Sequence, residues 1–527
     1  MNLSYQSSGG KASPADMAAA ALSGAVLALA FPDYNLWPLV WVGLVPLLIV
    51  LRGKNPAHGA LLGFITGAVL YQAVIWWIIN TVTQFGHLPL WMAALVQALF
   101  LFAISSYTAF FGFAITWIAR KSSEDLALAA SAPLWVAIEF ARGNMGHLAF
   151  PWARLADSQY LVTPIIQVAD IVGEDGISFL IVLVNATAAK VLLYSMDRRS
   201  GKAVFPSAWA AASMALILCA VGYGFVRLGE NVPPAKPVRV ALIQGNIDQA
   251  RKWDKSYIRP QLEIYTHRTI LAAREGIKTI FWPETAAPFF FGQDPDGDAL
   301  IKELSRETGA TIIFGAPAFV KRDGKIFEYN RSWVVRPDGF TQSYDKVHLV
   351  PFGEYVPFSN VLTFVHRVVT AIGEMEPGSG VRTLDAGEFK AGVQICYEVI
   401  FPRYSRAISL MGGTALINIT NDSWYGDSPA SWQSLAMGVF RAVENRMPFL
   451  RVAQSGVSAI VTDRGRIVSK TPLFVETTLT GEFTPKTGEP TVYAQMGDLF
   501  AWICALVSAA IAVYAGAFFR RYHVTLE

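Results

Sequence analysis

Eight long apolar segments constrain the fold of this 527-residue chain more than any other feature. Each is about long enough to cross a bilayer as a helix, which takes roughly 17 to 25 residues. The segments cover residues 15–31, 36–52, 58–82, 91–118, 125–141, 165–194, 204–225 and 497–519. With 53% hydrophobic and only 16% charged residues, the chain is too apolar for a wholly soluble protein. The sequence therefore predicts a membrane-embedded protein with eight transmembrane helices, the first of them a retained helix and not a cleaved signal.

Basic residues near the ends of these segments gather on one side of the predicted membrane. That side holds Lys11, Arg52, Lys54, Arg120, Lys121, Arg198, Arg199, Lys202, Arg520 and Arg521. The short connections on the other side hold only Arg142 and Arg154. Because Lys and Arg are retained in the cytoplasm, we expect both termini there and the long insert between the last two segments outside it. In a bacterium with two membranes, the chain would lie in the inner membrane and the insert in the periplasm.

The insert, residues 232–488, has a different pattern of apolar residues from the flanking regions 1–231 and 489–527. We expect it to form a domain of its own. Strand-like apolar runs alternate with helix-like stretches. The runs are 238–246, 279–287, 310–319, 391–399 and 413–421, and the helical stretches include 257–274 and 296–308. Continuously apolar strands are typical of a sheet buried on both faces. The insert is therefore predicted to be an α/β domain whose chemistry lies at its strand ends.

Charge and cysteine patterns exclude several classes of partner. The net charge is only +3 and no dense Lys/Arg run is present, so nucleic acid is not expected as a partner. Cys219, Cys396 and Cys504 form no CxxC pair, and the seven histidines form no HExxH or HxxxH pair. We therefore expect no metal site, no disulfide framework and no cofactor.

Three short motifs each place an ionisable residue at or near the end of an apolar strand. They are FWPE, which ends at Glu284, YDKVHLVPFGE, which contains Lys346, and CYE, which begins at Cys396. A carboxylate, an ammonium and a thiol in one pocket form a nucleophilic site without histidine, in which the lysine favours the thiolate. Cys396 would attack an acyl carbonyl, Lys346 would stabilise the oxyanion and Glu284 would move protons. All three are needed, because a single cysteine in a strand is more often a core residue.

The three motifs, in this order, resemble the Glu, Lys and Cys triad of the nitrilase superfamily. With seven apolar segments before the domain and one after it, the chain resembles the bacterial apolipoprotein N-acyltransferases. That resemblance implies that Glu284 is the general base, Lys346 the oxyanion-stabilising residue and Cys396 the nucleophile.

The same resemblance implies supporting residues around the triad. Glu354 would hold the catalytic lysine in place, and Tyr397 and Glu398 match the pair that follows the nucleophile. The implied fold is an αββα sandwich on the periplasmic side of the membrane. The implied reaction takes an acyl chain from a phospholipid, holds it as a thioester, and passes it to the N-terminal diacylglyceryl-cysteine of an apolipoprotein. We expect a monomer.

Weaker candidates line the predicted pocket. The motif NDSWYG begins where a strand ends, so Asn421, Trp424 and Tyr425 could face the same pocket, with Trp253 and Asn330 at its rim. The stretch from Pro357 to Ile372, PFSNVLTFVHRVVTAI, is largely apolar with helical spacing. It is predicted to be a lid that dips into the outer leaflet and admits lipid tails.

Two other functions stay open on the sequence. A membrane-tethered amidase of the same superfamily would hydrolyse small carbon–nitrogen bonds, although a tether needs only one span. A transporter or receptor would use the insert only to bind a ligand, and it requires polar residues along the spans. The candidates Glu139, Asp170, Glu174 and Asp175 lie near segment ends instead.

Overall fold

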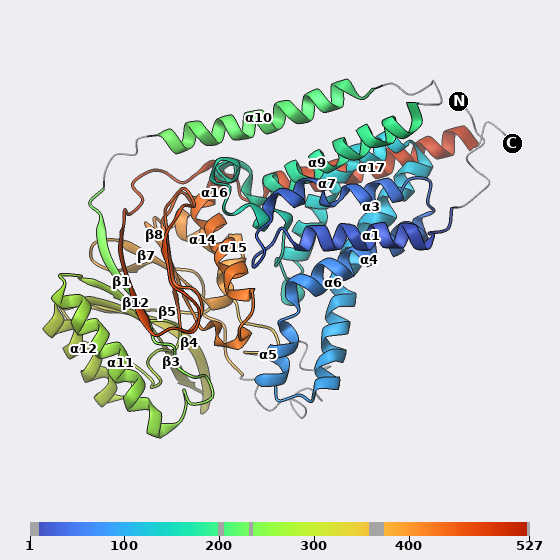
Figure 1. Ribbon diagram of the computed structural model, residues 1–527. Coiled ribbons are helices and arrows are strands. Elements are labelled where there is room, and N and C mark those ends of the chain that lie inside the picture. The colour runs from blue at the N-terminus through green and yellow to red at the C-terminus, as the bar shows by residue number, and fades with distance from the viewer. Residues whose placement is uncertain (1–9, 199–204, 231–234, 358–373, 524–527) are drawn as a thin grey trace. The chain divides into compact units, whose positions relative to one another are not determined.

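The computed structural model describes residues 10–198, 205–230, 235–357 and 374–523, and its chain divides into two compact units (Figure 1). The helical unit comprises Met1–Ile79, Leu90–Leu228 and Asp498–Glu527. The α/β unit comprises Asn80–Pro89 and Gly229–Gly497. The short segment of residues 80–89 therefore belongs with the α/β unit, although it lies between two helices of the other unit in sequence.

The helical unit is built almost entirely from helices joined by short turns. Its α-helices are α1 (Pro14–Ala28), α2 (Val40–Gly43), α3 (Val45–Val50), α4 (Pro56–Ile75), α6 (Leu90–Lys121), α7 (Glu124–Gly143), α8 (Thr163–Ile166), α9 (Ala169–Asp197), α10 (Ser207–Gly229) and α17 (Leu499–His523). Helix α5 (Ile78–Gln84) crosses the boundary between the units. The described residues of this unit also form three short 3-10 helices: η2 (Trp37–Leu39), η3 (Gly146–Leu148) and η4 (Leu155–Gln159).

Six helices among the described residues are long and apolar enough to cross a membrane: α4, α6, α7, α9, α10 and α17. Each coincides with a segment predicted from the sequence. The first predicted segment forms only the 15-residue helix α1, and the second forms the interrupted stretch Trp37–Val50. Both are shorter than a straight span requires. The prediction of eight transmembrane helices is therefore not confirmed, and the structure supports six.

Helix Trp37–Val50 is interrupted at Leu44, where a side chain from α9 replaces the missing backbone hydrogen bonds. The Leu44 N–H donates to Oδ1 of buried Asn185 at 2.8 Å, and Asn185 donates to the Val40 carbonyl at 2.9 Å. An interrupted helix away from water needs such a partner, because unpaired backbone groups are costly there. The interruption depends on a residue far along the chain, so the apolar pattern of residues 36–52 did not reveal it.

Helices α4 and α6 pack closely through small residues. A Cβ atom added to Gly63 would lie 2.1 Å from the Thr108 carbonyl oxygen, and one added to Gly112 would lie 2.1 Å from the Gly59 carbonyl oxygen. Larger residues at these positions would force the two helices apart. Close approach through glycine and threonine is typical of helices that associate in lipid, where packing replaces the hydrophobic effect.

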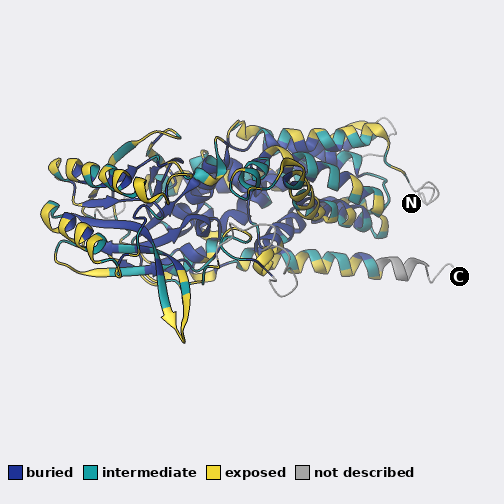
Figure 2. Cartoon of the chain, turned by 90° about the horizontal axis from the view of Figure 1, so that it is seen from below, coloured by how far each residue is buried: buried dark blue, intermediate teal, exposed yellow. Residues whose placement is uncertain are grey.

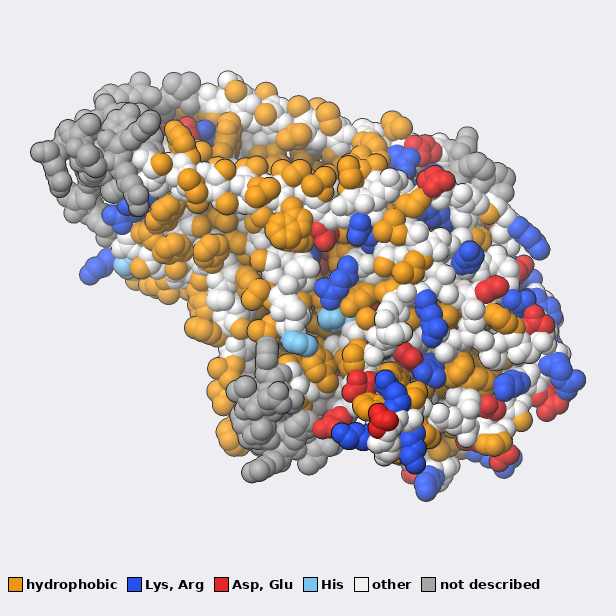
Figure 3. Space-filling view, turned by 180° about the vertical axis from the view of Figure 1, so that it is seen from behind, with side chains coloured by type: hydrophobic (Ala, Val, Ile, Leu, Met, Phe, Trp, Pro, Cys, Tyr) orange, Lys and Arg blue, Asp and Glu red, His pale blue; other side chains and the backbone are white. Residues whose placement is uncertain are grey.

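On the face drawn in Figure 3, the described surface of the helical unit is mostly hydrophobic, whereas charged side chains are spread over the α/β unit. On α6 alone, Leu90, Trp91, Leu99 and Phe102 are each 61–68% exposed. Apolar patches of this kind mark a surface that contacts something other than water. The surface of the helical unit is therefore suited to lipid.

The four acidic residues near the segment ends are buried, and Asp170, Glu174 and Asp175 form ion pairs. Arg154 lies 2.9 Å from both Glu174 and Asp175, and Arg227 lies 3.0 Å from Asp170. Buried ions without partners are very costly, so such pairs are what a structural role requires. The transporter hypothesis finds no support in these residues, because three of them already have an ion-pair partner and Glu139 accepts hydrogen bonds from Trp135 and from the Leu155 N–H.

The α/β unit contains two six-stranded sheets. The first has the order β12 (Thr477–Phe483), β1 (Val238–Gln244), β2 (Thr279–Phe281), β3 (Thr311–Arg322), β4 (Lys325–Val335) and β5 (Thr341–Asp345). The second has the order β11 (Ile467–Lys470), β10 (Ala459–Val461), β9 (Phe449–Ala453), β8 (Ala415–Thr420), β7 (Lys390–Ile395) and β6 (Leu384–Asp385). The neighbours β1, β2 and β3 are parallel, as are β7, β8 and β9.

Helices cover the outer face of each sheet. Helices α11 (Lys255–Arg274) and α12 (Pro295–Thr308) contact the first sheet, and α14 (Pro402–Leu410) and α15 (Ala430–Asn445) contact the second. The sheets contact each other through β1 and β9, and the short helix α16 (Val492–Met496) packs on α14 and α15. Most strand residues are buried, whereas exposed residues lie on the outer helices and on the hairpin tip that joins β3 to β4 (Figure 2). The predicted α/β domain with an αββα layer order is confirmed.

Candidate active site

Cys396 directly follows the last residue of β7, where the chain turns into the 3-10 helix η6 (Cys396–Ile400). Its φ is +52°, in the left-handed region that residues other than glycine rarely adopt. The strand predicted for residues 391–399 therefore ends at Ile395, because a residue with this φ cannot continue the pleat. Backbone strain of this kind is concentrated at functional sites, where a sharp turn presents a nucleophile at the end of a strand.

Glu284 lies three residues beyond β2 and is only 4% exposed. Its Oε1 accepts a hydrogen bond from Asn330 Nδ2 at 2.7 Å, and its Oε2 accepts one from the Asn421 N–H at 2.8 Å. Asn330 lies on β4 of the first sheet, and Asn421 follows β8 of the second. One donor from each sheet thus fixes the Glu284 carboxylate, and the site lies where strand ends of the two sheets meet.

Lys346 follows β5 and is 1% exposed. Its ammonium nitrogen lies 2.7 Å from Glu354 Oε1 and 3.7 Å from Glu284 Oε1. Burial by itself lowers the pKa of Lys346, but the two carboxylates together raise the pKa above its usual range. The Val350 N–H donates to the other Glu354 oxygen at 2.8 Å and so holds that carboxylate against the lysine. Lys346 is therefore a permanent buried cation.

The Cys396 thiol is neutral in the resting site. Burial, with a smaller contribution from Glu284, raises the pKa of Cys396 to about 12, although Lys346 and a hydrogen bond with Thr420 oppose this rise. The lysine does favour the thiolate, as the motifs suggested, but burial has the larger effect. A thiol in this state can act as a nucleophile only after a base has taken its proton.

Glu398 connects the two loops that carry the lysine and the cysteine. Its Oε1 accepts hydrogen bonds from the Tyr344 hydroxyl at 2.8 Å and from the Val347 and His348 N–H groups at 2.7 and 3.1 Å. Its Oε2 accepts one from the Ile395 N–H at 2.7 Å. These donors flank Lys346 on one side and Cys396 on the other. Burial raises the pKa of Glu398, while the Ile395 and His348 donors oppose that rise.

Tyr397 and Tyr425 also lie in the buried surroundings of the thiol. Tyr397 is 8% exposed and stacks on His348, with 5.8 Å between ring centroids. Burial raises the pKa of Tyr425 far above its usual range, and its interaction with Cys396 adds to the rise. Both phenols are therefore neutral groups close to the sulfur.

The two tryptophan candidates, Trp253 and Trp424, are more exposed than the residues around Cys396. Trp253 is 55% exposed, so it is not among the buried residues around Glu284. Trp424 is 38% exposed, its carbonyl accepts a hydrogen bond from Thr81 Oγ1 at 2.8 Å, and its ring contacts Phe85 edge-on at 4.8 Å. The predicted lid from Pro357 to Ile372 lies outside the described residues from position 358 onward.

Lys252 is a second buried cation, to which no motif pointed. It is 1% exposed, its ammonium donates to the Glu284 carbonyl oxygen at 3.2 Å, and its own carbonyl accepts from Gln261 Nε2 at 2.9 Å. Burial lowers the pKa of Lys252 to about 8, although Glu284 and Cys396 oppose this shift. In the sequence, Lys252 lies in the polar stretch DQARKWDK, which reads as a solvated loop. No local pattern could have identified its burial.

The Lys252 ammonium gives a prediction for the pH dependence of stability. Because the pKa of Lys252 is about 8 in the folded chain and 10.5 for an ordinary lysine, the unfolded chain binds more protons between these values. The free energy of unfolding should therefore gain a contribution, at most about 3 kcal/mol, as the pH rises from about 8 to about 10.5. Lys252→Met should lack this contribution. Thermal melting of the full chain in detergent across this pH range measures the contribution, and Lys325→Met, which removes an exposed lysine, is the control. If the stability of Lys252→Met changed with pH in the same way as that of Lys325→Met, the prediction would be wrong.

The chain matches known proteins over nearly its whole length. Residues 23–187 match the model of the apolipoprotein N-acyltransferase N-terminal domain, and residues 239–493 match that of carbon-nitrogen hydrolases. The apolipoprotein N-acyltransferase of Geobacter metallireducens is 41% identical over 512 residues, which cover 96% of each chain. That of Thermotoga maritima is 31% identical over 507 residues, which cover 94% of this chain and 92% of the relative. The chain therefore belongs to the apolipoprotein N-acyltransferase family.

Proposed function

We propose that this protein transfers an acyl chain from a phospholipid, through a thioester on Cys396, to the α-amino group of the N-terminal diacylglyceryl-cysteine of apolipoproteins. The observation that carries the proposal is the buried Lys346 ammonium, held between Glu354 and Glu284 beside the Cys396 thiol, in a chain of this family. The relatives' names supply the acceptor class. The phospholipid donor and the triad roles are our own assignments.

In the first half-reaction, Glu284 accepts the proton of the Cys396 thiol as the sulfur attacks the ester carbonyl of the phospholipid. The neutral resting thiol requires such a base. The Lys346 ammonium stabilises the oxyanion that develops on the carbonyl oxygen. The carbon–oxygen bond then breaks, Glu284 returns its proton to the departing alkoxide, and a lysophospholipid leaves the thioester behind.

In the second half-reaction, the α-amino group of the acceptor attacks the thioester carbonyl. Glu284 accepts a proton from the attacking nitrogen, and Lys346 again stabilises the oxyanion. The carbon–sulfur bond breaks, an amide forms, and Glu284 passes its proton to the departing Cys396 sulfur. Burial of Cys396, which is 8% exposed, keeps water from the thioester between the two steps.

The supporting residues hold this geometry. Glu354 fixes the lysine, Asn330 and the Asn421 backbone fix the Glu284 carboxylate, and Glu398 ties the lysine loop to the cysteine loop. Their hydrogen bonds support roles in positioning the triad. We assign no substrate contact to Trp253.

A membrane-tethered amidase is the second candidate, and the N-terminal half of the chain counts against it. Residues 23–187 match a domain described for apolipoprotein N-acyltransferases, which a tether alone does not require. Six apolar helices of spanning length likewise exceed the need of a tether. A monomeric acyltransferase that takes its phospholipid donor directly from the bilayer accounts for the N-terminal domain match and for the six apolar helices.

We also propose that both termini lie in the cytoplasm and that the α/β unit lies outside the inner membrane. Lys and Arg near the helix ends support this orientation. Protease added to spheroplasts should cleave the α/β unit and leave an epitope placed after Glu527 intact until the membrane is permeabilised. Protection of the α/β unit in sealed spheroplasts would contradict the orientation.

The decisive test of the function is to trap the acyl-enzyme. The purified full chain is incubated with a phospholipid that carries an isotope-labelled fatty acid, and the peptide containing Cys396 is weighed by mass spectrometry. We expect this peptide to gain one labelled acyl group and to lose it when hydroxylamine or a diacylglyceryl-cysteine peptide is added. Acylation of the acceptor without any labelled Cys396 would contradict the proposal. Hydrolysis of simple amides without uptake of label would favour the amidase.

A further inference from the structure

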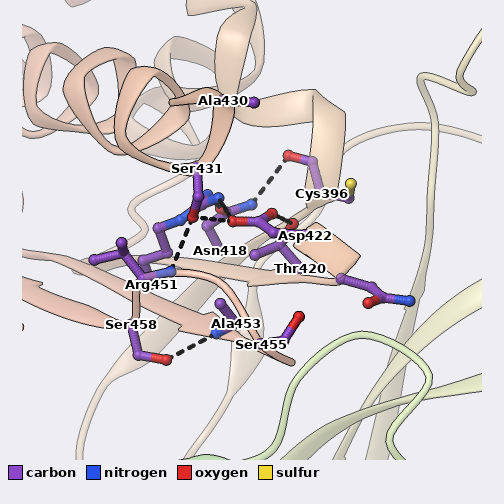
Figure 4. A network of polar contacts seen from close by, with 12 residues as sticks. Cys396, Asn418, Thr420, Asp422, Ala430, Ser431, Arg451, Ala453, Ser455 and Ser458 are labelled. Atoms are coloured by element: carbon purple, nitrogen blue, oxygen red, sulfur yellow. Dashed lines mark hydrogen bonds and ion pairs between the residues drawn. The ribbon is translucent and has the colours of Figure 1, made fainter. Parts of the chain in front are cut away.

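A buried polar network lies beside the nucleophile, on the strands of the second sheet that follow β7 (Figure 4). Asn418 of β8 donates from Nδ2 to the carbonyl oxygens of Gln394 and Cys396, at 3.0 and 3.2 Å. Gln394 is the register partner of Asn418 in the parallel ladder, and Cys396 lies two residues further along. Asn418 is fully buried. One side-chain amide therefore binds the backbone on both sides of the point where β7 turns into η6.

Arg451 determines which end of the Asn418 amide faces these carbonyls. Arg451 lies on β9, is fully buried and donates from Nη1 to Asn418 Oδ1. A guanidinium has only donors, so the amide oxygen must face Arg451 and the amide nitrogen must face β7. If the amide were reversed, its oxygen would lie against the carbonyl oxygens of Gln394 and Cys396. The cation therefore keeps Asn418 in the only orientation that can hold the backbone of the nucleophile.

Asp422 holds Arg451 in place. Arg451 Nη2 donates to Asp422 Oδ2 at 2.7 Å. The same carboxylate accepts hydrogen bonds from the Thr420 hydroxyl, at 2.8 Å, and from the Ser431 hydroxyl. A buried ion pair is by itself weak evidence for a contribution to stability. Its directed hydrogen bonds, however, fix the guanidinium in position, and the triad chemistry described above uses neither Asp422 nor Arg451.

We propose that Asn418 is a positioning residue for Cys396, and that Arg451 and Asp422 keep its amide in the orientation that this role requires. The left-handed φ of Cys396 is strained, and such a conformation persists only where neighbouring groups enforce it. Asn418 enforces it by binding the Cys396 carbonyl, and Glu398 does so by accepting a hydrogen bond from the N–H group of the preceding residue. The inference rests on the proposed function, because it takes Cys396 as the nucleophile.

Loss of the Asn418 amide should move the sulfur and leave the rest of the triad in place. Glu284 is held by Asn330 and a backbone N–H group, and Lys346 is held by Glu354. A reacting atom that is misplaced by about 1 Å can slow a reaction about 10²-fold. We therefore expect slower formation of the acyl-enzyme. The donor concentration that half-saturates this step should change little, because fully buried Asn418 has no surface for a substrate.

The test compares Asn418→Asp with Asn445→Asp in the full chain in detergent. Aspartate has the same shape as asparagine. At position 418 it keeps an oxygen for Arg451, which favours its ionised form, and it places the second oxygen against the two carbonyls. Asn445 on α15 is the matched control, because it is also fully buried and its Nδ2 also donates to a backbone carbonyl, that of Arg441, at 2.9 Å.

Two measurements are made on each chain. Mass spectrometry of the Cys396 peptide, after mixing with labelled phospholipid, gives the rate of acyl-enzyme formation. Hydrogen–deuterium exchange of the same peptide, without donor or acceptor, reports how often the turn opens. We expect Asn418→Asp to slow acylation about 10²-fold at saturating donor and to speed exchange about tenfold, since two hydrogen bonds to the turn are lost. Asn445→Asp should stay within about twofold of the unmodified chain in both measurements.

The double variant Arg451→Met/Asp422→Asn tests the orienting part of the proposal, and it replaces Asn418→Asp if that variant does not fold. It removes both charges of the ion pair, so no buried charge is left unpaired, and it leaves the Asn418 amide free to turn. We expect acylation about tenfold slower than in the unmodified chain. Acylation at the unmodified rate would overturn the role given to Arg451 and Asp422.

Unchanged acylation in a folded Asn418→Asp chain would overturn the positioning role, whatever the exchange shows. Equal changes in Asn445→Asp would overturn it too, because a general effect of a buried carboxylate would then explain them. If the unmodified chain forms no acyl-enzyme, the proposed function is wrong. The exchange measurement then still decides whether Asn418 holds the turn, and unchanged exchange in Asn418→Asp would show that it does not.

Discussion

Replacing Cys396 with alanine should lower the rate of acyl transfer by about 10⁴-fold or more, which is the scale of loss when a covalent nucleophile is removed. Without the sulfur no thioester can form, and the neighbouring Glu284 and Lys346 are left with no group to activate. Mass spectrometry of a diacylglyceryl-cysteine peptide, before and after incubation with phospholipid, measures the acylated product. A variant that keeps even a tenth of the rate would contradict the assignment of Cys396 as nucleophile.

Alanine is the informative replacement at this position, because it separates chemistry from folding. Alanine has the same Cβ as cysteine, so the left-handed φ of +52° costs both residues about equally. Loss of one sulfur atom should lower the free energy of unfolding by about 1 kcal/mol. Cys219→Ala and Cys504→Ala are matched controls in the helical unit, and we expect both to retain full activity. A Cys396→Ala chain that fails to fold would show no cooperative melting transition.

The parts of the α/β unit that could be predicted from sequence depend on local patterns. The runs that became β1, β3, β7 and β8 are continuously apolar, and residues 257–274 and 296–308 became α11 and α12 with nearly the predicted bounds. The three motifs were recognisable because each places an ionisable residue at or near a strand end. Their convergence was implied only by the family resemblance, because Glu284 and Lys346 follow strands of the first sheet, whereas Cys396 follows β7 of the second.

Features that depend on contacts between distant residues could not be predicted in this way. Strand β12 pairs with β1 across more than 200 residues of intervening chain. Lys252 lies in a polar stretch and Arg451 in a short strand, yet both are buried because Glu284 and Asp422 lie opposite them. A charged residue gives no local sign of burial when its partner comes from another element.

The predicted count of eight transmembrane helices was not confirmed, for a related reason. The hydropathy of residues 15–31 and 36–52 is high enough for two spans, but α1 is short and the second helix is interrupted at Leu44. The hydrogen bonds that permit this interruption come from Asn185 on α9. Composition describes how apolar a segment is, whereas the length of its helix depends on which partners its backbone finds.

Lys346→Met is expected to lower kcat by about 10³-fold, the upper range for loss of one oxyanion-stabilising group. It also removes the cation between the buried Glu284 carboxylate and the Glu354 carboxylate, whose side chain is 14% exposed. Among the described residues, Asn330 Nδ2 then remains close to both Oε1 atoms, at 2.7 Å from Glu284 and 3.3 Å from Glu354. Breaking a buried pair costs about 3–5 kcal/mol, because a charge stays behind unpaired. Initial rates and melting of the full chain in detergent measure the two effects separately, with Lys325→Met as the control for loss of an exposed lysine.

The double variant Lys346→Met/Glu354→Gln distinguishes the two roles of this lysine. Glutamine removes one of the stranded negative charges and keeps an oxygen for the Val350 N–H, so most of the lost stability should return. The rate should stay low, because no cation is restored where the oxyanion develops. If the double variant regained activity together with stability, Lys346 would act only by holding the site together. The proposed role in stabilising the oxyanion would then be wrong.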